Sequence, residues 1–74
     1  MSLEAVAKAY TSCVNLEEKA RGQGPELAEE AALLRADLHA LLMEALRQAK
    51  IPFADRSDAA RIAFEIAHDK RAAV

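Results

Sequence analysis

Cysteine, glycine, proline and aromatic residues are all scarce in this chain of 74 residues, which has one Cys, two Gly, two Pro, two Phe, one Tyr and no Trp. The single cysteine, Cys13, excludes an intrachain disulfide, whereas a small secreted domain normally needs several. No apolar run approaches the ~20 residues of a membrane span, and residues 1–5 lack the features of a signal peptide. We therefore expect a cytoplasmic protein with no membrane partner, and the abundance of alanine favours a bacterial one.

A surplus of positive charge is also missing, because the net charge is −2 and the pI about 5.6. Such a balance gives no overall electrostatic attraction to a nucleic acid or to an anionic membrane. The charge is mildly asymmetric: residues 1–37 carry four basic and seven acidic side chains, and residues 38–74 carry six and five. Any basic surface is therefore expected to be local and C-terminal.

Glycine and proline break the chain at only two places, residues 22–25 and 51–55, and no stretch alternates apolar and polar residues as a strand would. The sequence therefore predicts an all-α chain that forms one small domain over residues 1–74. The break at 22–24 is so short that the first two helices should form an antiparallel αα-hairpin. A third helix should complete a three-helix, bundle-like fold. The predicted helices cover about residues 3–21, 25–50 and 57–71.

The predicted second helix repeats apolar residues in the seven-residue pattern of a coiled-coil seam. We expect this seam to face the first helix, with Leu38 opposite Tyr10. Leu42 and Leu46 form a second apolar edge, where the third helix is expected to sit. The seam consists of Leu27, Ala31, Leu34, Leu38, Leu41 and Ala45.

The same helix is also apolar on a third side, where alanines at four-residue spacing would let another helix approach closely. On the predicted third helix, Ile62 and Phe64 lie at opposite edges of an apolar arc that is wide for one small hairpin to cover. For a chain of this length, the free energy gained by burial roughly equals the cost in chain entropy. These features favour completion of the fold by dimerisation. The candidate interface consists of Ala32, Leu33, Ala36, Ala40, Met43, Ile62 and Phe64.

Residues that could carry chemistry occur singly. Cys13 is expected in the hairpin core as a small hydrophobe, and His39 is expected at the edge of the packed seam in a structural role. Glu65 and His68 have the Glu-x-x-His spacing of carboxylate-bridged di-metal bundles, but the chain has no second such pair. Phosphate-binding loops, Cys-x-x-Cys pairs and catalytic Ser/His/Asp sets are missing too. We therefore expect no enzymatic activity, no cofactor and no metal site.

One stretch of the sequence points to nucleic acid. Residues 42–53 (LMEALRQAKIPF) lead through a short turn into residues 56–62 (RSDAARI), and this arrangement resembles the helix-extended-helix of SAP-type DNA-binding modules over about 20 residues. The Gly and Lys usual in the linker of that family are missing, and the second helix is longer. Nearby basic residues could contact phosphates, although we favour their interpretation as helix C-terminal and solvated residues. The candidates are Arg47, Lys50, Arg56, Arg61, Lys70 and Arg71.

The leading hypothesis from the sequence is a non-enzymatic helical module for protein–protein interaction. It would form a homodimer and act as an accessory protein, that is, as an adaptor, inhibitor or assembly factor for another protein. The alternative hypothesis is a small DNA-associated regulatory protein that uses the third helix and its basic flanks.

Overall fold

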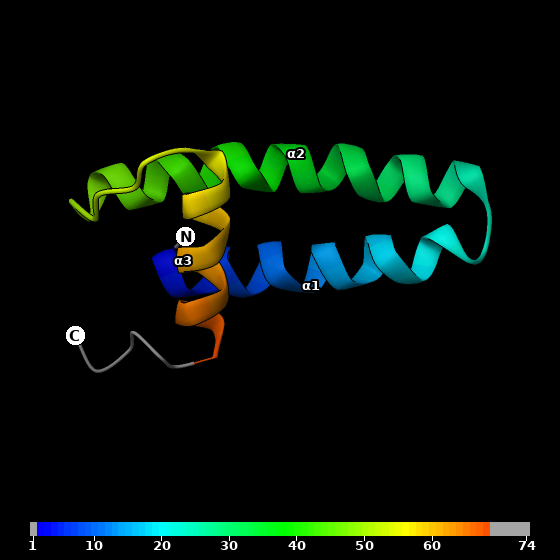
Figure 1. Ribbon diagram of the computed structural model, residues 1–74, viewed down its shortest axis with the longest axis horizontal. Coiled ribbons are helices and arrows are strands. Elements are labelled where there is room, and N and C mark those ends of the chain that lie inside the picture. The colour runs from blue at the N-terminus through cyan, green and yellow to red at the C-terminus, as the bar shows by residue number, and fades with distance from the viewer. Residues whose placement is uncertain (1, 69–74) are drawn as a thin grey trace.

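Three helices make up the computed structural model, which describes residues 2–68 (Figure 1). They are α1 (Leu3–Arg21), α2 (Pro25–Gln48) and α3 (Arg56–Ala67), and this part of the chain contains no strand. The predicted all-helical fold with three helices is therefore confirmed. The packing of the helices is compatible with a bundle-like arrangement.

The first two helices form an antiparallel hairpin, as the short break between them predicts (Figure 1). Ser2 caps α1, because its side chain accepts a hydrogen bond from the backbone N–H of Ala5 at 3.1 Å. Gly22 ends α1 with ordinary right-handed backbone angles. Gly24 has a φ of 150°, which L residues with side chains rarely adopt, so glycine is needed at this point of the turn.

The second helix ends at Gln48, two residues before the predicted boundary. The N–H of Ile51 donates to the carbonyl of Leu46, and the N–H of Lys50 donates to the carbonyl of Arg47, both at 3.0 Å. This is the Schellman pattern, in which the residue after the cap takes a left-handed conformation. Lys50 has a φ of 60°, a conformation that usually requires glycine, so this helix end could not be recognised from the type of residue.

The third helix begins at Arg56, one residue before the predicted boundary, and ends at Ala67. Asp55 is its N-cap, with the side chain accepting from the N–H of Asp58 at 2.9 Å. Asp58 in turn accepts from the N–H of Ala54 at 2.9 Å, so two backbone donors at this helix end are satisfied. The predicted end at residue 71 lies outside the described residues, and His68 follows the helix as its C-cap.

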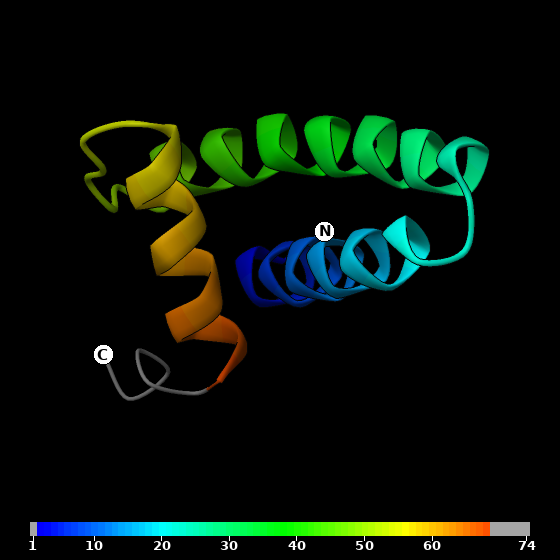
Figure 2. The same cartoon turned by 45° about the vertical axis from the view of Figure 1, so that its right-hand side comes forward.

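The third helix crosses the hairpin at the end away from the α1–α2 turn, running across the two helices instead of along them (Figures 1 and 2). The main core lies at this crossing, where residues from all three helices meet. Leu42 and Leu46 of α2 are completely buried there, which confirms that this edge of α2 seats the third helix. The core cluster consists of Val6, Ala7, Tyr10, Leu42, Leu46, Ala59, Ile62 and Ala63.

The predicted seam between α1 and α2 is partly wrong. Ala31 is buried, and Leu38 and Ala45 are partly buried, but Leu27, Leu34 and Leu41 are 42%, 50% and 53% exposed. The seven-residue pattern was assigned to the contact with α1, but it does not determine the angle at which α2 is turned between α1 and α3. Because α3 also packs on the Leu42 and Leu46 edge, the buried arc of α2 is centred between its two neighbours, and the leucines on its other edge remain in solvent. The buried residues of α2 are Ala31, His39, Leu42 and Leu46.

A matched pair of substitutions tests this rotation of α2. Leu42→Ala should lower the free energy of unfolding by about 2–5 kcal/mol, because it leaves a cavity in the core. Leu34→Ala, measured by urea denaturation in the same dilute solution, should lower it by less than about 1 kcal/mol, because half of that side chain is already in water. Equal losses for the two variants would show that the structure has α2 turned the wrong way.

Candidate functional site

The residues of the predicted interface do not all lie at the surface. Leu33 is 64% exposed, and Ala36 and Ala40 are exposed beside it on α2. Ala32 and Met43 are partly buried, and Met43 packs against the core cluster. Ile62 is 1% exposed and belongs to that cluster, so it cannot contact a partner, and its place in the predicted interface is wrong. The reason is that α3 crosses the hairpin and buries this edge of its apolar arc.

A larger apolar surface lies on the hairpin itself. Leu27, Leu34 and Leu41 are seven residues apart, so they form one nearly straight stripe along α2. Val6 of α1 lines the same shallow depression as Leu41, so this side of α2 and the Val6 side of α1 adjoin. Leu16 of α1, 48% exposed, lies about 120° round the helix from Tyr10, whose ring contacts Phe64 of α3, so Leu16 is also on the side of the hairpin away from α3. We call these four side chains, Leu16, Leu27, Leu34 and Leu41, the leucine surface.

Charges of opposite sign border the leucine surface on its two edges. Glu30, Asp37 and Glu44 are exposed on α2, each three or four residues from a leucine of the stripe, so they follow it along its outer edge. On α1, exposed Lys19 adjoins Leu16 on its outer side, and Lys8 lies two turns further along the same edge, in an ion pair with Glu4 at 2.9 Å. The acidic edge therefore belongs to α2 and the basic edge to α1.

The third helix contacts the other side of the hairpin. His39 of α2 lies well round the helix from the leucine stripe, and its ring meets the first residue of α3, since its Nε2 lies 3.0 Å from the carbonyl oxygen of Arg56. Packing of α3 therefore leaves the leucine surface uncovered.

His39 is buried and links the three helices, in agreement with the structural role expected for it. Because the carbonyl of Arg56 can only accept, Nε2 carries the proton, and Nδ1 accepts from the hydroxyl of Tyr10 at 3.4 Å. Burial lowers the pKa of His39, and the nearby positive charges of Arg56 and Arg35 lower it further, although the hydrogen bond to the Arg56 carbonyl opposes this shift. The neutral ring is therefore the form that fits the fold.

A second polar contact lies within the α1–α2 interface, nearer the turn. The carboxylate of Glu17, almost fully buried, accepts a charge-assisted hydrogen bond from the guanidinium of half-buried Arg35. Cys13 is buried as expected, and its thiol donates weakly to the carbonyl of Ala31 at 3.5 Å. Burial raises the pKa of the Cys13 thiol, and the charge of Glu17 adds to this, so the reactive thiolate is disfavoured.

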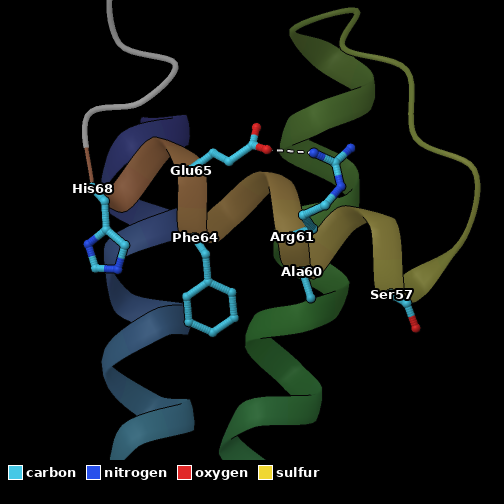
Figure 3. Close-up of a pocket in the computed structure, with 6 residues that line it drawn as sticks. All are labelled: Ser57, Ala60, Arg61, Phe64, Glu65 and His68. Atoms are coloured by element: carbon cyan, nitrogen blue, oxygen red, sulfur yellow. Dashed lines mark hydrogen bonds and ion pairs between the residues drawn. The ribbon is translucent and has the colours of Figure 1, made fainter.

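A depression of about 410 Å³ runs along α3 and is open to solvent (Figure 3). It is lined by Ser57, Ala60, Arg61, Phe64, Glu65 and His68, and the Glu65 side chain extends away from His68 to pair with Arg61 (Figure 3). Glu65 and His68 thus do not converge, despite their metal-ligand spacing. The described residues include no group of three His, Cys, Asp or Glu side chains that could hold a metal ion.

Among the described residues, two of the four predicted nucleic-acid residues are paired with acidic side chains of their own helices. The guanidinium of Arg61 pairs with Asp58 and Glu65 on its own helix. Arg47 pairs with Glu44, and its guanidinium lies 5.5 Å from the centre of the Phe53 ring. Arg56 and Lys50 are exposed, while Lys70 and Arg71 lie outside the described residues.

Comparisons of the chain with protein-family models, with curated proteins and with solved structures found no match. Within residues 2–68, no helix is both long enough and apolar enough to cross a membrane.

The pKa of His39 predicts a pH dependence of stability. Folding lowers the pKa of His39 below the ordinary value near 6.5, so the unfolded chain binds the proton more readily than the folded one. The contribution of the neutral His39 ring to the free energy of unfolding is therefore fully present only above pH ~6.5. The free energy of unfolding should fall as the pH is lowered from 7 to 5. In His39→Gln, whose amide can still bond to Arg56 and Tyr10, this fall should be smaller.

His68→Gln is the matched control, because His68 is exposed and follows α3. It should keep the pH dependence of the parent in the same denaturation series. A parent with constant stability between pH 7 and 5 would show that His39 is not held as a neutral, buried ring.

Proposed function

We propose that the chain is a non-enzymatic helical module for protein–protein interaction, which acts in the cytoplasm as an adaptor, inhibitor or assembly factor. The single observation that supports this proposal most is the leucine surface, four half-exposed leucines on one side of a hairpin. Soluble monomers rarely leave a contiguous apolar patch of large side chains in water, and such patches commonly mark interaction sites.

The spacing of the leucines suggests what kind of partner binds. Leu27, Leu34 and Leu41 repeat every seven residues, which is the period at which a second helix keeps contact along its whole length. Covering the exposed half of each leucine is worth about 1 kcal/mol, so the surface favours a partner that contacts all four together. A helix or helix pair lying along the hairpin meets this requirement.

Photo-crosslinking tests the proposal in living host cells and with the purified chain. A benzophenone amino acid in place of Leu34 should give covalent adducts with a protein, because this position lies in the middle of the stripe. The same group in place of Glu18, which is exposed on the other side of α1, is the matched control and should give few adducts. The benzophenone amino acid in place of Ala36 shows whether the alanine side of α2 gives as many adducts as the leucine surface.

Absence of protein adducts at position 34, both in cells and with the purified chain at ~100 μM, would contradict the proposal. Adducts at position 36 but not 34 would move the interface to the alanine side. Adducts with nucleic acid in place of protein would favour the DNA-associated alternative.

A further inference from the structure

We infer that the leucine surface binds a second copy of this chain, so that two hairpins form a four-helix bundle in which α1 of each copy lies over α2 of the other. The inference rests on the proposed function, since it names the partner of the same surface. Three observations support it: the opposite signs of the charges on the two edges, the positions of these charges along the hairpin axis, and the position of α3.

The edges of the leucine surface make it complementary to itself. The α2 edge carries Glu30, Asp37 and Glu44, and the α1 edge carries Lys8 and Lys19. A partner of uniform charge would attract one edge and repel the other. A second copy that is turned to place its basic edge on the acidic edge of the first satisfies both edges at once.

Only one of the two simple two-fold arrangements achieves this match. If the two-fold axis runs along the hairpin, α1 of one copy covers α2 of the other, and each acidic edge meets a basic edge. If the axis runs across the hairpin, α2 covers α2, so the two copies of Asp37 approach one another and Glu30 approaches Glu44. Like charges in such contact are unfavourable, and the first arrangement is therefore the one we propose.

The positions of the charges along the hairpin axis agree with this arrangement. Lys19 and Glu30 both lie within two helical turns of the Gly22–Gly24 connection, on opposite helices of the hairpin. Rotation about a two-fold axis parallel to the helices does not change the position of a residue along that axis. Lys19 of each copy therefore meets Glu30 of the other. Leu16 then lies close to Leu34 of the second copy, in the middle of the new apolar core.

The third helix does not obstruct this bundle. It contacts α2 through His39, well round the helix from the leucine stripe, and it crosses the hairpin at one end (Figures 1 and 2). Each copy therefore keeps α3 on the outside of the bundle, where the depression lined by Phe64 stays open (Figure 3).

Disulfide trapping of the purified chain tests the arrangement. In a Cys13→Ala background, the double variant Lys19→Cys/Glu30→Cys should oxidise to a covalent dimer. Within one chain these positions lie on the outer sides of two helices, whose axes are ~8–10 Å apart, too far for a disulfide. The single variant Asp37→Cys, in the same background, should form little covalent dimer, because it would pair only in the α2-over-α2 arrangement.

Charge exchange gives an independent measurement by analytical ultracentrifugation. Lys19→Glu should weaken the dimer about tenfold, because two symmetry-related ion pairs become repulsive contacts. Glu30→Lys should weaken it similarly. The combined variant Lys19→Glu/Glu30→Lys should recover most of the loss, since the pairs are restored with exchanged signs. Circular dichroism of each variant should remain that of the parent, because both side chains are exposed.

Three results would overturn the inference. A parent that stays monomeric at ~100 μM, while position 34 crosslinks to another protein in cells, would leave the proposed function standing and exclude the second copy as the partner. A dimer that is trapped through Asp37→Cys but not through the Lys19→Cys/Glu30→Cys pair would exclude the arrangement. A dimer whose affinity does not respond to the charge changes would exclude the role of the edges.

Discussion

The third helix packs on the Leu42 and Leu46 edge of α2, at the end of the hairpin away from its turn (Figure 1). Both leucines are fully buried between α3 and α1, and Ile62 of α3 fills the space against them. This contact determines how α2 is turned about its own axis. The same rotation buries His39 and moves Leu27, Leu34 and Leu41 into solvent, so the core at one end of the molecule creates the exposed surface along the hairpin.

Two buried polar contacts stabilise this arrangement against alternatives. His39 joins Tyr10 of α1 to the start of α3, and Glu17 joins α1 to Arg35 of α2 nearer the turn. A helix slipped or turned by one residue would leave these groups buried without partners, which is costly. Within the described residues, no buried side-chain nitrogen or oxygen lacks a hydrogen-bond partner. The apolar residues thus supply the driving force, and the polar ones make a single register preferable.

Much of the fold could be predicted because it depends on local signals. Glycine and proline mark both breaks between helices. Ser2 and Asp55 cap α1 and α3 because their side-chain oxygens accept hydrogen bonds from backbone N–H groups, and Leu42 and Leu46 pack against α3. The end of α2 was missed because Lys50 occupies a left-handed position without being glycine.

The candidate site could be predicted only in part, because exposure depends on all neighbours of a helix together. The seven-residue repeat of Leu27, Leu34 and Leu41 was visible in the sequence, but it does not say which helix it faces. The seven-residue period is typical of helix packing, and only the position of α3 showed that this surface stays exposed among the described residues (Figure 1). Ile62 was misassigned to the surface for the same reason.

In the proposed dimer, a second copy covers the leucine surface with α1 over α2. Isotope-filtered nuclear Overhauser spectroscopy on a mixture of labelled and unlabelled chain tests it most directly, because only contacts between copies give signals. We expect intermolecular signals between the methyl groups of Leu16 and Leu34. Spectra of the concentrated mixture without any intermolecular signal, or with signals only between the two copies of Leu34, would contradict it.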